Sequence, residues 1–415
     1  MAARLPELGR SGDEVLAELR EMKGLDADWR HGRVPLYVFK ANDEVDRVGR
    51  EAFVTYFAEN ALGSKRAFLS LGRMEREVVE MGLGLFGAPE HAQGFMTTGG
   101  TESIIQAVRA CRNHARAMRG APRHRGNIVV PVTAHLAFDK AADLMDLEVR
   151  RTPVGQDFRA DPEALAQASD DDTIMWVGSA PCFPFGVVDP IAGLAEQAKA
   201  RGIWLHVDAC VGGYLAPFVK MNGGDVPDFD FAIPGVSSLS ADLHKFGFTP
   251  KPASTVFYRS MDLAAHHGFA LDGWPSGPFV TSTIVGTRPG GGVAGAWATL
   301  QLLGVTGYRA IARDLMAMVG AYRAGVSRIE GLHVLGNPHL SIVAVGARDV
   351  DVFRVAEVLA AKGWVPGLVR EPKAIHRMMS MLHAPSLDAY LADLAAAVAE
   401  VRGEADRQAG VQASY

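Results

Sequence analysis

A histidine, His244, stands directly before a lysine, Lys245, in the stretch LSADLHKFGFTPK at residues 239–251, and a second lysine, Lys251, ends it. A lysine amine that loses hydration among apolar and small residues has a lowered pKa, and it can then bond covalently to a carbonyl carbon. Because most lysines lie on protein surfaces, a solvated loop lysine is the alternative for each of the two. The other segments of the chain that could carry chemistry decide between these interpretations.

A glycine turn leads into a helical pattern in the stretch FMTTGGTES. Gly99, Gly100 and Thr101 come just before the expected helix. Glycines at a helix start let backbone N–H groups approach an anion, and the helix dipole adds positive potential there. No Gly-Lys-Ser/Thr follows, which excludes a P-loop, and a plain tight connection is the structural alternative. The turn is a candidate phosphate site.

A carboxylate and a histidine follow two expected strands. In WLHVDACVGG, Asp208 ends an apolar run, where a buried carboxylate needs a cation or a donor such as a protonated ring nitrogen. A capping or loop carboxylate is the alternative. In TAHLAFDK, His135 follows a strand and could stack on a flat ring, although single histidines are mostly structural. His206 is expected to pack or to support the site by hydrogen bonding.

These four segments occur along the chain in the order glycine turn, histidine, aspartate, lysine. Together they supply an anion cradle, a stacking group, a partner for a pyridinium nitrogen and an amine. Pyridoxal phosphate, which acts as an electron sink for carbanion chemistry, requires this set of groups. The combination is more specific than any member and predicts pyridoxal 5'-phosphate as the cofactor.

The elements that must position these residues follow an alternating pattern between about residues 95 and 260. Short β-branched runs alternate with helical segments, which predicts a mostly parallel sheet covered on both faces. Such sheets bind ligands at the carboxyl ends of their strands. Strands are expected at 127–132, 173–177, 203–207 and 254–258, and helices at 102–118 and 191–200.

Three parts are expected along the chain. Residues 1–60 form an N-terminal helical arm, 61–305 the large cofactor-binding domain, and 306–415 a small C-terminal domain. The Gly/Pro-rich passage 273–292 interrupts the strand-helix alternation, and a helix-compatible run begins at 293. In the small domain, strands are expected at 340–345 and 376–381, with a helix at 351–362.

Composition is that of an ordinary globular protein, with 48% apolar and 21% charged residues among 415. The net charge of -5 gives no reason to expect nucleic acid or an anionic membrane as a partner. Cys111, Cys182 and Cys210 are widely spaced, so we expect no metal site and a reducing compartment. The first residues lack the apolar centre of a signal peptide, and no apolar run reaches the ~18 residues of a membrane span. A soluble cytoplasmic protein is expected.

At these segments the sequence resembles the sphingosine-1-phosphate lyase branch of the fold-type-I pyridoxal-phosphate enzymes, close to the group II amino-acid decarboxylases. The resemblance runs from about residue 59 to 383. It implies an α/β fold like that of aspartate aminotransferase, with a mostly parallel sheet flanked by helices and a smaller C-terminal α/β domain. Its strongest pieces are TGGTESI (98–104), AHxAFDKA (134–141), HVDACxGG (206–213), SADxHK (240–245) and GTRPGG (286–291).

The resemblance also implies how the cofactor is held. Lys245 would form the Schiff base with it, and Asp208 would keep its ring nitrogen protonated. His135 would stack over the ring, while Ala209 would pack behind it. The cofactor phosphate would lie against Gly99, Gly100, Thr101, Ser240 and His244.

By the same resemblance, a turn formed by Gly286, Thr287 and Arg288 would reach the cofactor of a neighbouring subunit. An obligate homodimer with shared active sites is therefore implied. Arg288 and Lys251 would contact the substrate, and Lys251 would serve in proton transfer or in binding a substrate phosphate. A surface role for Lys251 is the alternative.

One segment departs from the family pattern. The stretch NALGSKRAFLSL at 60–71 has Gly63 and Ser64 where the family usually carries His or Asn followed by Pro. Because this segment helps to shape the substrate pocket in the family, the cofactor chemistry is better supported than the substrate. Lys65 and Arg66 could compensate as anion contacts, with a solvated basic pair as the alternative.

Two reactions are compatible with these residues. A phosphorylated 2-amino-3-hydroxy compound would lose its hydroxyl proton to a base and break between the two neighbouring carbons, giving an aldehyde and phosphoethanolamine. An amino acid would instead lose its carboxylate. The GTRPGG and DACxGG segments look more like the lyases, so a carbon-carbon lyase acting on a sphingoid-base phosphate is the prediction. An amino-acid decarboxylase is the main alternative, and a catalytically silent cofactor-binding protein is the third.

Overall fold

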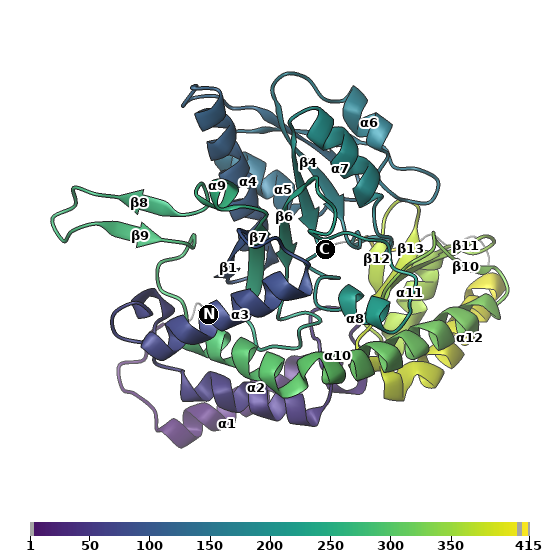
Figure 1. Ribbon diagram of the computed structural model, residues 1–415. Coiled ribbons are helices and arrows are strands. Elements are labelled where there is room, and N and C mark those ends of the chain that lie inside the picture. The colour runs from purple at the N-terminus through teal and green to yellow at the C-terminus, as the bar shows by residue number, and fades with distance from the viewer. Residues whose placement is uncertain (1–3, 405–408, 414–415) are drawn as a thin grey trace.

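A β-sheet forms the centre of the large domain (Figure 1). It has seven strands in the order β1-β7-β6-β5-β4-β2-β3. The structure is a computed structural model that describes residues 4–404 and 409–413. Neighbouring strands from β6 through β5, β4 and β2 to β3 pair in parallel, while β7 runs antiparallel to both β6 and β1. The strands are β1 Gln93–Thr97, β2 Asn127–Pro131, β3 Glu148–Thr152, β4 Thr173–Ser179, β5 Trp204–Asp208, β6 Val236–Ala241 and β7 Ser254–Tyr258.

Both faces of this sheet are covered, because its central strands are apolar on both sides. Strand β4, for example, sends Met175 and Val177 into one hydrophobic cluster and Trp176 into the other. Helices α4 (Gly100–Met118) and α5 (Ala137–Met145) cover the first face. Helix α7 (Ile191–Ala200) lies on the second, together with α3 (Leu69–Leu85) and α8 (Ala216–Met221). The predicted doubly covered, mostly parallel sheet is confirmed.

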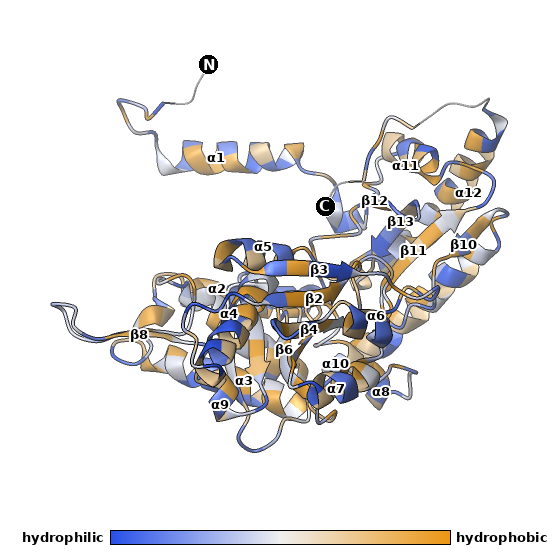
Figure 2. Ribbon diagram, turned by 90° about the horizontal axis from the view of Figure 1, so that it is seen from above, coloured by the Kyte–Doolittle hydropathy of each residue, from blue (hydrophilic) through white to orange (hydrophobic). Residues whose placement is uncertain are grey.

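The N-terminal part contributes two long helices, α1 (Gly12–Met22) and α2 (Asp43–Thr55). Asn42 caps α2 by accepting a 2.9 Å hydrogen bond from the Val45 amide. Helix α2 packs along α10 (Gly290–Ser327), whereas α1 stands apart from the body in Figure 2. Residues 1–3 of the expected arm lie outside the described residues.

The C-terminal part carries a four-stranded antiparallel sheet of order β10-β11-β13-β12. The residue ranges of β11 and β13 overlap those of the two strands that were expected at 340–345 and 376–381. Helices α11 and α12 contact each other, and α11 packs on β13. The bounds are β10 Leu332–Val334, β11 Ile342–Ala347, β12 Gly367–Val369, β13 Ala374–Met378, α11 Val352–Ala361 and α12 Leu387–Gly403.

Helix α10 connects the large and small parts without a loop. Inside it, Gly304 has φ 49° and ψ -174°, a conformation that interrupts the helix. The domain boundary expected after residue 305 falls beside this kink, and the three-part division of the chain stays a proposal.

A two-stranded hairpin, β8 (Phe269–Leu271) with β9 (Phe279–Thr281), projects from the large domain in Figure 1. It occupies part of the passage that the sequence marked as rich in glycine and proline. In the part of the chain that the structure describes, no helix is long and apolar enough to span a membrane. The remaining short helices are α6 Pro162–Gln167 and α9 Met261–Ala264, with 3-10 turns at Lys23–Leu25, Trp29–His31, Ala61–Gly63 and Met381–Ser386.

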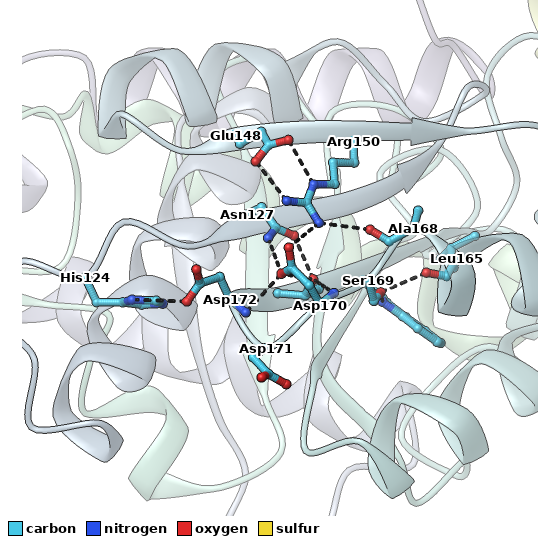
Figure 3. Close-up of polar contacts among 12 residues, drawn as sticks. His124, Asn127, Glu148, Arg150, Leu165, Ala168, Ser169, Asp170, Asp171 and Asp172 are labelled. Atoms are coloured by element: carbon cyan, nitrogen blue, oxygen red, sulfur yellow. Dashed lines mark hydrogen bonds and ion pairs between the residues drawn. The ribbon is translucent and has the colours of Figure 1, made fainter.

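A polar network fixes the amino ends of β2, β3 and β4 (Figure 3). The Asp170 carboxylate accepts hydrogen bonds from the Asn127 amide group at 2.9 Å and the Asp172 backbone at 2.9 Å. It also forms a 2.7 Å ion pair with Arg150, which reaches across from β3. The hydrogen bond from Asn127, followed by that from Arg150, lowers the pKa of Asp170 to about 2. This network lies at the end of the sheet opposite to the pocket described next.

Candidate active site

A pocket of about 400 Å³ lies where several strands of the large sheet end. Ser179 ends β4 and Asp208 ends β5, while Asp242 directly follows β6. Carboxyl ends of parallel strands are where open α/β sheets bind ligands. Of the residues expected at the site, the structure brings these into one pocket wall: Gly99, Gly100, Thr101, His135, Asp208, His244 and Lys245.

The Lys245 amine forms a 3.0 Å ion pair with the carboxylate of Asp242. Burial lowers the pKa of Lys245, but the negative charge of Asp242, supported by that of Asp208, raises it by more, so the net pKa lies above the ordinary lysine value. The prediction that the Lys245 pKa falls is therefore wrong, because the apolar neighbours along the chain indicate burial but do not reveal this carboxylate as a partner. The pKa of Asp242 is lowered, because burial raises it but the positive charge of Lys245 and the hydrogen bond from Ser254 lower it by more.

The glycine turn brings backbone close to that carboxylate. Gly100 is the first residue of α4, and a Cβ added there would lie 2.7 Å from Asp242 Oδ2 and 2.8 Å from the Cys210 sulfur. Only a residue without a side chain fits this approach. The positive end of α4 therefore faces the pocket through Gly99 and Gly100, as an anion cradle requires.

Glu102, which was not among the residues predicted from the sequence, holds the cradle in place. Its carboxylate accepts hydrogen bonds from the Thr98 amide at 2.7 Å and the Thr98 hydroxyl at 2.6 Å. Its other oxygen accepts from the Ile284 amide at 2.6 Å. The sequence shows an acidic residue at this helix start, but its burial and its partner at Ile284, far along the chain, could not be inferred.

Asp208 is supported from the neighbouring strand. The register of β5 and β6 sets it opposite Ser240, whose hydroxyl lies 3.4 Å from Asp208 Oδ1, and the Cys210 amide donates to the same oxygen at 3.0 Å. His206 lies between Ser238 and Ser240 at 2.7 and 3.2 Å. Burial lowers the pKa of His206 to about 4, so this ring is a neutral supporting group.

Two of the expected cofactor contacts lie behind the pocket wall. Ser240 is fully buried beside Asp208, and its hydroxyl lies 3.4 Å from the Cys210 sulfur, the same atom that a Cβ on Gly100 would meet at 2.8 Å. Ala209 is also fully buried, and its amide donates to the Ser240 carbonyl at 2.9 Å. Both residues therefore help to hold Asp208 in position.

His135 and His244 both line the pocket, and each accepts a hydrogen bond from a backbone amide. The Ala137 amide donates to His135 Nδ1 at 3.1 Å, and the Ala253 amide donates to His244 Nδ1 at 3.3 Å. In each neutral ring the proton therefore sits on Nε2. Burial lowers the pKa of both histidines, and the nearby carboxylates only partly oppose this effect.

Lys251 lies in an adjoining apolar pocket of about 200 Å³, whose wall also includes His244, Lys245 and Phe183. Its amine donates a 2.8 Å hydrogen bond to the Tyr37 carbonyl. The residue is exposed to solvent, and partial burial of its amine lowers its pKa. The structure thus places a cation next to, and not inside, the main pocket.

The turn of Gly286, Thr287 and Arg288 lies away from this pocket within the same chain. Arg288 is buried in a 2.7 Å ion pair with Glu75, and Asn60 binds the backbone of Arg288 and the hydroxyl of Thr287. Arg288 borders a separate cavity of about 420 Å³. The irregular segment after Asn60 contributes Ser64 and Lys65 to that cavity rather than to the main pocket.

Comparisons with known proteins agree with this architecture. Residues 70–347 match the family described as the pyridoxal-dependent decarboxylase conserved domain. The chain is 38% identical to a sphingosine-1-phosphate lyase of Arabidopsis thaliana over 94% of this chain and 73% of that protein. It is 36% identical to a probable L-tyrosine/L-aspartate decarboxylase of Methanothrix thermoacetophila, over 94% of this chain and 96% of that protein.

Among solved structures, the sphingosine-1-phosphate lyase of Burkholderia pseudomallei superimposes with a TM-score of 0.92 at 33% identity. The alignment covers 97% of this chain and 94% of that one. Fold and pocket together define a pyridoxal-phosphate-dependent lyase of fold type I. Within this class, the chain belongs to the pyridoxal-dependent decarboxylase family, in its sphingosine-1-phosphate lyase branch.

The residues of the pocket fit that cofactor chemically. A helix start with two glycines offers N–H groups for a phosphate, and Asp208 offers a carboxylate to a ring nitrogen. Lys245 supplies the amine, and the pocket volume lies in the usual range for a small bound molecule. The predicted cofactor is confirmed by the family, whereas the roles of the individual residues stay predictions.

Proposed function

We propose that the protein is a carbon-carbon lyase that splits a phosphorylated 2-amino-3-hydroxy compound of the sphingoid-base type into an aldehyde and phosphoethanolamine. The observation that carries this proposal is the near full-length similarity to sphingosine-1-phosphate lyases at 33–38% identity. It is supported by a pocket that brings the glycine turn, Asp208 and Lys245 together. When bound, pyridoxal phosphate withdraws electrons from a bond at the amine-bearing carbon of the substrate.

In this proposal the pocket walls hold the cofactor at three points. The amides at Gly99, Gly100 and Thr101 bind its phosphate, the Asp208 carboxylate binds its ring nitrogen, and the Lys245 amine binds its aldehyde carbon. His135, whose side chain lines the same pocket, packs against the ring. Because its ring is neutral and carries its proton on Nε2, His135 acts as a hydrogen-bond donor there.

The substrate would extend from this pocket toward Lys251. The adjoining pocket is lined by Leu36, Phe39 and Met378, which suit an apolar chain, and Lys251 adds a cation that suits a phosphate. The lowered pKa of Lys251 also favours proton transfer with the substrate hydroxyl. These two roles for Lys251 make different kinetic predictions.

Product analysis by mass spectrometry tests the proposal. Cofactor-loaded protein is incubated separately with dihydrosphingosine-1-phosphate and with L-tyrosine, L-aspartate and other amino acids. A long-chain aldehyde with phosphoethanolamine is the expected result, and Lys245→Ala should form neither. Amines and carbon dioxide from an amino acid would overturn the lyase proposal in favour of decarboxylation, which the similarity to the Methanothrix protein makes the second candidate.

A Lys251→Met variant distinguishes the two roles of that lysine. If Lys251 transfers protons, kcat should fall about 10²- to 10⁴-fold while the cofactor absorption stays unchanged. If it binds the phosphate, KM should rise and kcat should change little. Lys140, an exposed lysine on α5, supplies the matched control Lys140→Met, for which no kinetic change is expected.

A homodimer with shared active sites is also part of the proposal. Asn60 and Glu75 bind Thr287 and Arg288 of the turn, yet Gly286 and Thr287 are exposed and lie outside the main pocket of their own chain. A second subunit whose pocket receives this turn would account for both observations.

A further inference from the structure

Asp242 is a buried carboxylate to which neither the sequence motifs nor the proposed function assign a role. Its side chain is 1% exposed. It follows strand β6, and its own amide donates to the Cys210 carbonyl at 3.3 Å, which fixes the backbone at this point. The Ser254 hydroxyl donates a short hydrogen bond to its Oδ1. The carboxylate is therefore held in one orientation by strands on both sides.

Its second oxygen faces the catalytic lysine. Asp242 Oδ2 lies 3.0 Å from Lys245 Nζ and 3.8 Å from His244 Nε2. The same oxygen is the atom that a Cβ on Gly100 would meet at 2.7 Å. Asp242 thus touches both the lysine and the start of the expected phosphate cradle.

A carboxylate in this position needs a compensating cation. A buried and unpaired charge is strongly destabilising, and a cofactor phosphate bound at the start of α4 would add further negative charge nearby. Lys245 supplies the positive charge whenever its amine carries a proton. The arrangement therefore favours the ammonium form of Lys245 over the neutral amine.

We propose that Asp242 is a positioning residue that receives the Lys245 ammonium whenever this amine is not bonded to the cofactor, and that it thereby sets the pH at which Lys245 becomes reactive. The proposal rests on the assignment of Lys245 in the proposed function, but it is independent of which substrate the enzyme uses.

The proton balance of substrate exchange agrees with this role. When the substrate nitrogen replaces Lys245 on the cofactor carbon, the bond from that carbon to Nζ would break. The two protons that the substrate ammonium loses would end on Nζ, which already carries one proton and so becomes an ammonium group. Asp242 Oδ2, at 3.0 Å, is the acceptor that holds this group close enough to return.

Other charged and titratable groups also face Lys245, so the test must separate their effect from that of Asp242. Asp208 acts in the same direction as Asp242. The Cys210 thiol stays neutral, because burial raises its pKa well above the ordinary value. The remaining groups are His135 and His244 in the main pocket and Lys251 in the adjoining one.

Reconstitution of the cofactor-free protein tests the proposal. Pyridoxal phosphate is added at a series of pH values, and the visible absorption of the lysine-bound cofactor is followed by stopped flow. For wild type the rate should rise with pH as Nζ loses its extra proton. For Asp242→Asn the same rise should have its midpoint at lower pH, and at a fixed pH below both midpoints the rate should increase about tenfold for each pH unit that separates them. Asp242→Glu, which retains a carboxylate, should move the midpoint back toward wild type.

Superimposable profiles for Asp242→Asn and wild type would overturn the proposal. Asp143→Asn, an exposed and isosteric change on α5, is the matched control and should follow wild type. Lys245→Ala should give no lysine-bound absorption at any pH. If it does give such absorption, the Lys245 assignment fails, and this outcome is distinguishable from a failure of Asp242 alone.

A second measurement uses wild type alone and so does not depend on the folding of a variant. Cofactor-free protein is treated briefly with acetic anhydride across a pH series, and acetylation of Lys245 and of exposed Lys140 is compared by peptide mass spectrometry. The midpoint for Lys245 should lie above that for Lys140. A midpoint at or below that of Lys140 would show that Asp242 does not retain the proton.

Discussion

The two glycines of the cradle are neighbours with different steric surroundings, which gives a test at the scale of single residues. An alanine at 100 would bring its Cβ to 2.7 Å from Asp242 Oδ2, whereas at 99 the nearest group, a His244 ring carbon, lies at 3.7 Å. Gly99 has φ 170°, an extended conformation that any residue adopts.

We therefore expect Gly100→Ala to destabilise the cofactor-free protein by about 1–3 kcal/mol through overpacking, while Gly99→Ala leaves its thermal stability nearly unchanged. Thermal unfolding of the two variants without cofactor measures the difference. Equal Tm values for the two variants would contradict the steric account of Gly100.

Single residues also show what the sequence could reveal about the site. Asp208, Lys245 and the glycine turn were identified because each stands at a strand or helix end, where side chains of neighbouring elements converge. The placement of Ser240 near the phosphate stays a prediction, and the pairing of β5 with β6 adds a contact with Asp208 that the sequence did not indicate. Strand register depends on the whole sheet, so a motif alone could not provide it. The ion pair that raises the Lys245 pKa was missed for a different reason: Asp242 stands only three residues earlier, but the sequence does not show that the backbone after β6 turns the two side chains toward each other.

At the scale of single elements, the kink in α10 allows the free-energy cost of one backbone conformation to be measured. Gly304 has φ 49°, in the left-handed region, and a Cβ added there would meet nothing within 4 Å. Gly320 lies in the same helix with ordinary helical backbone and equally open surroundings.

Gly304→Ala should thus destabilise the protein by about 1–2 kcal/mol, because a side chain is unfavourable in this conformation. Gly320→Ala should stabilise it by about 0.5–1 kcal/mol, because alanine loses less conformational freedom in a helix than glycine does. The comparison of the two Tm shifts is the measurement, and shifts of the same sign would contradict the backbone explanation.

The Asp170 network in Figure 3 predicts an acid dependence of stability. Because hydrogen bonds from Asn127 and Arg150 lower the folded-state pKa of Asp170 to about 2, below its ordinary value of 3.8, its contribution to stability is present above pH ~4. The contribution should disappear as the pH falls toward 2. Asp170→Asn should therefore lower Tm at pH 7, and the difference from wild type should shrink between about pH 4 and 2.

Thermal unfolding across this pH range checks the prediction. Asp143→Asn, on the exposed side of α5, provides the matched control. A Tm difference for Asp170→Asn that stays constant down to pH 2 would show that the network owes its stability to something other than the carboxylate charge.

At the scale of the whole molecule, the proposed shared active sites predict complementation between two defective chains. Lys245→Ala lacks the amine, and Thr287→Trp would place a bulky group in the turn that reaches the partner's pocket. Each variant alone should lack the visible absorption of the lysine-bound cofactor. In a mixed dimer, one pocket combines the intact Lys245 of one chain with the intact turn of the other, so part of the absorption should return.

Co-expression with two affinity tags, followed by purification through both, isolates the mixed dimers for this measurement. Double-tagged protein without any absorption would contradict a shared site, and failure to recover double-tagged protein would contradict the dimer.

Much of the overall fold could be anticipated from the order of its elements. The strands expected at 173–177 and 254–258 and the helix at 191–200 agree with β4, β7 and α7. Strands β1, β3 and β6 were not identified: β3 is interrupted by charged residues, and β6 is rich in serine. Apolar periodicity does not reveal strands whose burial is decided by their neighbours.

The position of β1 in the sheet has a consequence for how the chain is made. Strand β1, which leads into the Gly99–Gly100 cradle, is an edge strand whose partner is β7, and α2 packs on α10. During synthesis, β1 therefore cannot pair until β7, which ends at Tyr258, has been made. The loop between these two strands is long, and closing a long loop is slow. A nascent chain has no place for the cofactor until more than half of it has left the ribosome. We accordingly expect the concentration of the cofactor to affect the stability of completed chains and to leave the early steps of folding unchanged.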